Sequence, residues 1–322
     1  MAGSHHIPNH TRCRWWTLLI IIFPLSATAN NPVIIGVEDQ QIPVGPHLMI
    51  LEDPHANLDL EQVLAIEETT RWTPSNSATT SLGITHSAYW FSTVITHSSA
   101  LDRSWLMEID YAHLNDVRVF TVTASGVAEL IFEGGSLRPF EQRLIFHRNL
   151  AIPLMLPRNE PIRIILRAET SGPMYMPLTL WTAEAFHSHD TIRTLTMGLY
   201  YGIMLVMALY NLFIYLAIRE RSFLYYVLFI TSYATFQAGI NGLTYQYLWP
   251  DSIWWNTHSI PVFVPASSTL LCLFTSEILS LKETSPRYHR ALMVVAAVAA
   301  LVSLSSFLLP YSVVIRIGIF MR

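Results

Sequence analysis

The strongest candidates for binding chemistry are four basic side chains that fall within eleven residues: Arg138, Arg143, His147 and Arg148. Arginine and histidine donate charge-assisted hydrogen bonds, so this basic cluster could hold an anion or the carboxylate of a small ligand. If the segment is a strand, side-chain alternation places His147 and Arg148 on opposite faces. We therefore expect at most half of the cluster to converge on one ligand.

Aromatic residues offer a second kind of contact in the same half of the chain. Tyr89, Trp90, Trp105 and Trp181 could stack on a sugar-like ligand. Each ring taken alone is better explained as part of a hydrophobic core, because aromatic side chains bury large apolar areas there. We keep Tyr89 and Trp90 as the aromatic candidates beside the basic cluster.

Catalytic patterns are missing from this part of the sequence. Residues 30–190 contain no nucleophile motif, no metal-ligand spacing and no glycine-rich phosphate loop. His5, His6 and His10 resemble a metal cluster, but they precede the core of a targeting segment that export would remove. We expect no cofactor and no catalytic residue here, and whether the whole protein is an enzyme stays open.

The composition is that of a membrane protein. Of the 322 residues, 52% are hydrophobic and only 13% are charged, whereas about a quarter are charged in soluble proteins. The net charge of -4, without a basic patch, argues against nucleic-acid binding. Long uncharged runs predict four membrane helices, each long enough to span a bilayer. They lie near 195–218, 223–242, 259–280 and 291–309, and a fifth starts at Ser312.

The position of that fifth run bears on the length of the protein. The sequence stops ten residues after Ser312, so we expect these 322 residues to be a fragment. Arg322 would then lie about 15 Å deep in the bilayer, where an arginine is costly and usually faces the protein interior.

Few polar residues interrupt the predicted spans. Asn211, Gln237 and Asn241 are the main ones, and the last two share one helical face. They indicate interhelical hydrogen bonds rather than a transport path. Gly198 and Gly202 form a GxxxG pair, which permits close approach of a neighbouring helix.

The N-terminus is typical of a signal peptide. Arg12 and Arg14 precede the apolar run Trp15–Leu25, and Ala27-Thr28-Ala29 supplies a small-residue cleavage pattern. We predict that residues 1–29 are removed on export, with an uncleaved anchor as the alternative.

The loops between spans give the orientation. Arg219 and Arg221 follow the first span and further basic residues lie at 282–290, whereas 243–258 contains no lysine or arginine. Positive loops stay in the cytoplasm, so residues 30–185 are exported.

The exported domain, residues 30–185, has the pattern of an all-β fold. A capping-box pattern at Asp59 and Gln62 predicts a short helix near 59–67. Beyond it, apolar residues alternate with Arg118, Arg163 and Arg167, which is typical of strands. Regularly spaced turns favour a jelly-roll-like sandwich, joined to the first span by a linker at 186–194.

Five segments of the sequence resemble a known family. LEDPHANLDLEQVL (51–64), WLMEIDYAHLNDV (105–117) and PLTLWTAEAF (177–186) are similar to the type-2 extracellular domain of bacterial seven-transmembrane receptors with diverse intracellular signalling modules. GLYYGIMLVMALYNLFIYLAIRERSFLYYVLFITSYATFQ (198–237) and LTYQYLWPDSIWWN (243–256) are similar to the start of their seven-helix domain.

The resemblance implies a periplasmic jelly-roll domain that binds carbohydrate or another small ligand. It also implies seven spans in the bacterial inner membrane, in contact with lipid, and a cytoplasmic diguanylate cyclase or histidine kinase. Three classes therefore stay open: a receptor module, either monomeric or homodimeric, the sensory part of a membrane enzyme, and a transporter. The transporter is disfavoured because the predicted spans show no inverted repeat and hardly any intramembrane charge.

The topology yields a first prediction. Alkaline phosphatase fused after residue 250 should be active, because that loop is exported, and a fusion after residue 285 should be silent. Enzyme activity in intact cells, with a cytoplasmic reporter at the same positions as control, checks this. The reverse pattern would overturn the orientation.

Overall fold

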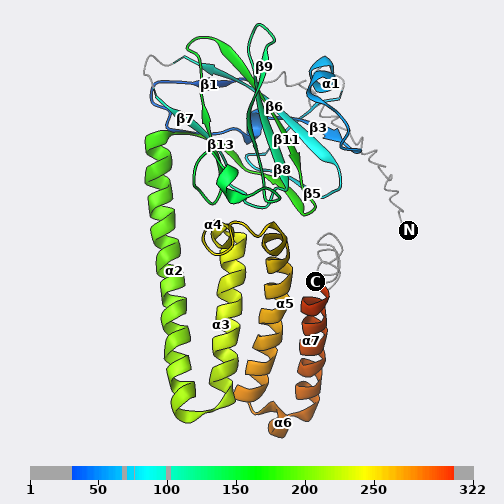
Figure 1. Ribbon diagram of the computed structural model, residues 1–322, viewed down its shortest axis with the longest axis vertical. Coiled ribbons are helices and arrows are strands. Elements are labelled where there is room, and N and C mark those ends of the chain that lie inside the picture. Colours follow the sequence, from blue (N-terminus) through cyan, green and yellow to red (C-terminus); the bar gives the residue numbers. More distant parts are fainter. Residues whose placement is uncertain (1–30, 67–70, 76, 99–102, 308–322) are drawn as a thin grey trace, which may run out of the picture.

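The computed structural model describes residues 31–66, 71–75, 77–98 and 103–307. A β-domain stands above a bundle of long helices (Figure 1). The predicted fold class is confirmed, since sandwich-like antiparallel sheets precede four helices long and apolar enough to cross a membrane. The finer jelly-roll description stays a prediction. The predicted signal peptide, the fifth span and Arg322 lie outside the described residues.

The larger sheet has the strand order β4-β3-β6-β11-β8-β9, and β1 pairs in parallel with β6. Its long strands alternate apolar residues on the inner face with polar or aromatic residues on the outer face. The strands are β1 (Val33–Ile35), β3 (Met49–Asp53), β4 (Thr73–Pro74), β6 (Ala88–His97), β8 (Asp116–Val122), β9 (Ala128–Gly134) and β11 (Pro161–Glu169).

The smaller sheet has the order β10-β7-β13-β2, and a separate pair, β12-β5, lies at the edge of the sandwich. Trp105 and Met107 of the smaller sheet and Phe91 and Ile164 of the larger one belong to a single buried core, which accounts for the sandwich. The strands are β2 (Gln41–Pro43), β5 (Thr80–Ile84), β7 (Trp105–Ile109), β10 (Leu150–Leu154), β12 (Pro173–Met176) and β13 (Leu178–Thr182).

Helix α1 (Leu60–Ala65) covers part of the outer face of the larger sheet. Its predicted capping box is confirmed: Asp59 Oδ1 accepts from the Gln62 amide at 2.8 Å, and Gln62 Oε1 accepts from the Asp59 amide at 3.1 Å. Val63 packs with Trp90 in a second apolar cluster between helix and sheet. Two short 3-10 helices, η1 (Gly45–His47) and η2 (Phe140–Gln142), complete the domain.

Within the described residues, four long helices form the membrane region. The segments predicted near 195–218 and 223–242 correspond to the first two, whereas the third and fourth begin before the predicted 259 and 291. The helices are α2 (Ala183–Ile218), α3 (Arg221–Ile240), α4 (Leu243–Tyr247), α5 (Ile253–Ile278), α6 (Leu281–Thr284) and α7 (Pro286–Ser305).

Helix α2 runs through the segment predicted to be a linker, 186–194. Thr182 caps it by accepting from the Ala185 amide at 3.3 Å, and no proline interrupts it. Its 36 residues span about 54 Å at 1.5 Å per residue, far more than the ~30 Å hydrocarbon core. Its first turns therefore stand outside the membrane, against the β-domain.

Two prolines lie inside α5, and a neighbouring helix compensates for one of them. Pro265 has no amide hydrogen to donate to the carbonyl of Pro261. Ser306 Oγ lies 3.1 Å from that carbonyl and 2.9 Å from the carbonyl of Val302. In a membrane, such contacts from neighbouring serines make prolines tolerable within helices.

This contact generates a second prediction. Ser306→Ala should lower the free energy of unfolding by about 0.5–1.5 kcal/mol, because the Pro261 carbonyl loses its donor in a lipid environment. Ser305→Ala is the matched control, since Ser305 Oγ donates to the Val302 carbonyl of its own helix. Unfolding in mixed micelles by increasing fractions of dodecyl sulfate measures both. Equal losses in the two variants would contradict the role of Ser306.

Candidate functional site

A pocket of about 470 Å³ opens on the outer face of the larger sheet. Strand register builds its floor, because Trp90 on β6, Arg167 on β11 and Arg118 on β8 are direct cross-strand neighbours. Glu169 and Asp116 form the next pair of β11 and β8 on the same face, and both also line the pocket. Side chains two residues apart on a strand share a face, so these five point the same way.

The segment between β3 and α1 forms the roof of the pocket. Buried Asp53 organises it by accepting from the amides of Asn57 and Leu58 at 3.3 and 2.9 Å. Arg167 Nη2 donates to the carbonyl of Ala56 at 3.5 Å and joins the roof to the floor. The roof is therefore placed by Asp53 beneath it and by Arg167 of the pocket floor.

Ion pairs connect the polar side chains of the pocket lining to one another and to Arg138 and Glu133 beside it. Asp116 lies 3.3 Å from Arg118, 3.1 Å from Arg138 and 3.5 Å from Arg167. Glu133 lies 3.0 Å from Arg118 and 2.6 Å from Arg138, and Arg167 also pairs with Glu169 at 3.0 Å. The wall thus offers both hydrogen-bond donors and acceptors to a polar ligand, with little net charge.

The aromatic residues of the pocket play unequal parts. Trp90 is only 1% exposed and stacks on Phe120 at 6.2 Å between ring centroids. Its Nε1 has no hydrogen-bond partner among the described residues. Phe120, which is half-buried and also lines the pocket, is the ring that a ligand reaches first.

The six predicted ligand residues do not come together. Trp90 lines the pocket, and Arg138 pairs with the carboxylates of its wall. Tyr89 alternates to the opposite face of β6 and belongs to the sandwich core. Arg143, His147 and Arg148 lie on the side of the domain that faces the helices.

His147 and Arg148 both bind the first part of α2. His147 Nε2 lies 3.0 Å from Asp190 Oδ1, and Arg148 Nη2 lies 2.8 Å from the same oxygen. Arg148 Nη1 also donates to Thr194 Oγ1 at 3.3 Å. The expected alternation does not separate them, because both residues precede β10, which begins at Leu150.

A second polar group connects the smaller sheet to the same helix. Arg193 Nη1 lies 2.8 Å from Asp110 Oδ1. Asn149 donates to Asp110 and to Glu108 at 2.6 and 2.7 Å, and Trp181 Nε1 donates to Glu108 at 3.0 Å. Glu108 is 3% exposed, so the part of the network around Glu108 and Asn149 lies in the domain interior.

The loop between β9 and β10 lies on α4. Arg143 donates to the carbonyls of His147, Arg148 and Asn149, and its guanidinium stacks 4.4 Å from the Phe140 ring centroid. Burial lowers the pKa of Arg143 to about 10, which still leaves it charged at neutral pH. Arg143 therefore stabilises the loop rather than pointing into the pocket.

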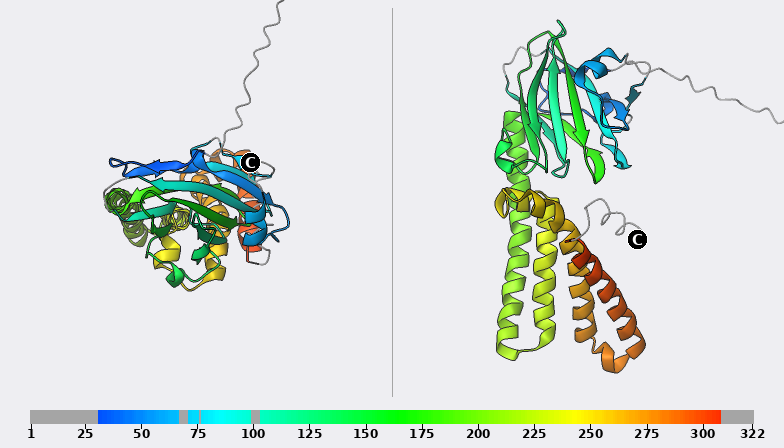
Figure 2. Two further views of the ribbon diagram at one scale, coloured as in Figure 1. Left: turned by 90° about the horizontal axis from the view of Figure 1, so that it is seen from above. Right: turned by 45° about the vertical axis from the view of Figure 1, so that its right-hand side comes forward.

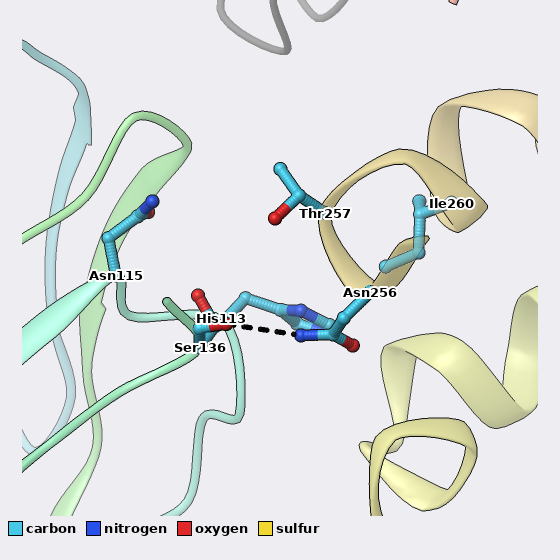
Figure 3. A pocket seen from close by; sticks show the side chains of 6 residues that line it. All are labelled: His113, Asn115, Ser136, Asn256, Thr257 and Ile260. Atoms are coloured by element: carbon cyan, nitrogen blue, oxygen red, sulfur yellow. Dashed lines mark hydrogen bonds between the residues drawn. The ribbon is translucent and has the colours of Figure 1, made fainter. Parts of the chain in front are cut away.

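The β-domain also contacts the outer ends of α3 and α5. His113 Nε2 donates to the carbonyl of Ile240 at 3.1 Å, and burial lowers the pKa of His113, which favours the neutral ring. Asn256 Nδ2 donates to the carbonyl of Ser136 at 3.5 Å across a small cavity lined by both side chains (Figure 3). Asn115 lines this cavity and also the larger pocket.

Gly242, between α3 and α4, explains how closely the two parts approach. It has a φ of +73°, and a Cβ there would lie 2.9 Å from Ala112 Cβ and 3.0 Å from the Arg148 carbonyl. Glycine adopts this φ without strain and, because it has no Cβ, leaves room for the domain.

The polar residues of the spans have local roles. Asn241 donates to Tyr201 Oη at 3.1 Å and so connects α3 to α2, whereas Asn211 donates to the Met207 carbonyl of its own helix. Gln237 is half-buried in α3. No described atom lies within 4 Å of a Cβ built on Gly198 or Gly202, so this pair meets no helix in the part of the chain described.

Comparison with known proteins gives two family matches. A model described as 7TMR-DISM extracellular 2 matches residues 45–182, and one described as 7TM diverse intracellular signalling matches residues 193–321. They coincide with the β-domain and the helical region. No curated protein matches the chain.

The junction generates a third prediction. Asp190→Ala should lower the free energy of unfolding by about 3 kcal/mol, because it leaves Arg148 buried without its carboxylate. Arg193→Ala, in the same helix, is the control and should cost at most about 1 kcal/mol, since its ion pair is more exposed. Thermal unfolding of both variants in detergent measures the difference. Indistinguishable losses would show that the Arg148–Asp190 pair does not hold the junction.

Proposed function

Because the chain belongs to the family of seven-transmembrane receptors with diverse intracellular signalling modules, we propose that it senses a small ligand outside the membrane and transmits occupancy through its helices. The β-domain is the exported sensor and α2, α3, α5 and α7 are the first spans. The membrane is the bacterial inner membrane, so the sensor faces the periplasm.

The observation that carries this proposal is the double attachment of Arg138. Its side chain pairs with Asp116 and Glu133 at the pocket, while its backbone carbonyl accepts a hydrogen bond from the Tyr245 hydroxyl of α4. A ligand that competes for Asp116 therefore acts on a residue that also touches the membrane region. Asn115, the residue before Asp116, lines both the pocket and the cavity at α5.

The pocket supports a polar, uncharged ligand such as a carbohydrate. Its wall carries arginines and carboxylates in near balance, so ligand hydroxyls find both donors and acceptors. The partly exposed ring of Phe120 adds an apolar contact. In this proposal Arg143, His147 and Arg148 transmit the signal rather than contact the ligand.

The remaining parts of the proposal concern output and assembly. A cytoplasmic module such as a diguanylate cyclase or a histidine kinase would receive the signal, as the resemblance implies. The outward face of α2, which carries Gly198 and Gly202 and is almost fully exposed, is available for lipid or for a second copy in a homodimer.

A fourth prediction tests the pocket. Arg118→Ala should weaken binding of a sugar ligand about ten- to a hundredfold, because a charge-assisted hydrogen bond contributes roughly 1.5–3 kcal/mol. A panel of neutral mono- and disaccharides is screened by thermal shift on the chain in nanodiscs, and hits are titrated by calorimetry. Glu129→Ala, on β9 and away from the pocket lining, is the control and should bind like the parent.

Two outcomes would contradict the proposal. If Arg118→Ala binds a sugar hit with parental affinity, the ligand site lies elsewhere. If a bound sugar leaves hydrogen exchange of α4 and of the first turns of α2 unchanged, the domain binds without transmitting.

A further inference from the structure

A patch of large apolar side chains is exposed where the β-domain meets the helices. Leu144 and Phe146 come from the loop between η2 and β10, and Tyr247 and Leu248 come from the end of α4 and the residue after it. Their exposed fractions are 56%, 66%, 64% and 65% in that order. We call these four residues the rim patch. Exposed apolar side chains that gather in this way are typical of a binding surface.

The loop holds its two members of the rim patch in place. Arg143 donates to three consecutive backbone carbonyls, which closes the loop on itself. Phe140, which is buried, packs edge-to-face against Phe146 at 5.2 Å between ring centroids. Ile145 turns inward to a buried cluster, so Leu144 and Phe146 on either side of it turn outward.

The two halves of the patch are in direct contact. The rings of Phe146 and Tyr247 lie 6.2 Å apart and edge-to-face. Gln246 Nε2 donates to the Phe146 carbonyl at 3.4 Å. The loop of the β-domain and helix α4 therefore present one continuous surface.

The position of α4 fixes the level of this surface relative to the bilayer. Helix α3 ends at Ile240 and α5 begins at Ile253, so the connection between them crosses the outer edge of the hydrocarbon region. That connection lies between the β-domain and the ends of α3 and α5 that face it (Figure 1; Figure 2, right). Exposed Trp254 lies in the first turn of α5, the end of the helix that joins this connection.

We propose that the rim patch inserts into the outer leaflet, so that the sensory domain itself binds the phospholipid surface through Leu144 and Phe146. Aromatic and aliphatic side chains at this depth leave water for the headgroup and upper acyl region, where amphipathic rings such as that of Tyr247 are favoured. The patch extends a surface that the adjoining spans already place in lipid. The domain is then attached to the membrane at a second place besides α2.

Collision accessibility of spin labels tests this directly. Phe146→Cys and Leu144→Cys are prepared separately, with Cys13 and Cys272 replaced by serine, and labelled with a nitroxide in nanodiscs of phosphatidylcholine and phosphatidylglycerol. Phe146 packs on the rings of Phe140 and Tyr247, so replacing it could disturb the loop; Leu144→Cys keeps both of these ring contacts and is the second labelling site. Power saturation then compares collisions with oxygen, which concentrates in lipid, and with a water-soluble nickel chelate.

Two controls bracket the result. Phe213→Cys, on the exposed face of α2 within its span, reports lipid. Val127→Cys reports water, because it lies in the β8–β9 hairpin, and β8 carries the chain about 20 Å away from the end that meets the helices. The ratio of oxygen to nickel collisions at 144 and 146 should shift from the Val127 value toward the Phe213 value.

Each remaining outcome rejects the proposal. A ratio equal to that of Val127→Cys would place the patch in water. Low collision rates with both reagents would indicate that protein covers the patch, for example a second copy of the chain. A lipid-like ratio that persists when the protein is transferred to a lipid-free amphipathic polymer would also count against it, because the signal would then arise from the protein.

Discussion

The coupling between the two parts of this protein depends on an unbroken chain segment. Strand β13 ends at Thr182 and α2 begins at Ala183, so the smaller sheet continues directly into the first membrane helix. Buried Arg148 and His147 then hold Asp190 on the second turn of that helix. A movement of the smaller sheet cannot be absorbed by a flexible linker and must be passed to α2 or resisted by it.

The ion pairs at this junction determine the position of α2 more than they add to the stability of the fold. Burying two charges costs desolvation free energy that their attraction only partly repays, whereas removing one partner is strongly destabilising. Any shift of α2 that separates Asp190 from Arg148 would therefore leave a buried charge unpaired, at a high cost in free energy. Arg143 contrasts with this pair, because backbone carbonyls and aromatic rings surround it instead of a carboxylate. It fixes a loop without selecting a partner charge.

Much of the architecture follows from local patterns, but the site does not. The capping box at Asp59, the alternation around Arg118 and Arg167 and the uncharged runs after 195 are short-range signals, and the structure has the corresponding helix, strands and spans. The pocket depends instead on the register between β6, β11 and β8, which one sequence does not specify. The alternating arginines were visible, yet nothing local showed that they share a face with Trp90.

The basic cluster shows the same limit from the other side. Its members are close in sequence, but η2 and the following loop lie between Arg138 and Arg148. Arg138 pairs with Asp116 at the pocket, whereas Arg148 pairs with Asp190 of α2. The linker prediction placed a boundary at the start of the uncharged run, whereas the helix starts at its cap, Thr182. Hydropathy marks where lipid begins, and capping marks where the helix begins.

If the chain is the receptor proposed above, the ion pairs at the pocket provide a physical route from ligand to helix. Three arginines share three carboxylates there, and Asp116 alone contacts all of the arginines. A ligand hydroxyl that donates to Asp116 weakens its hold on Arg138, and the other pairs can rearrange without leaving a charge uncompensated. Arg138, then held mainly by Glu133, can shift together with its carbonyl, which the Tyr245 hydroxyl follows. Since packed interfaces change between discrete arrangements rather than deform continuously, a small shift at Arg138 suffices to favour one arrangement of α4 over another. Signalling by this route requires only that the ligand bind the two arrangements with different affinities.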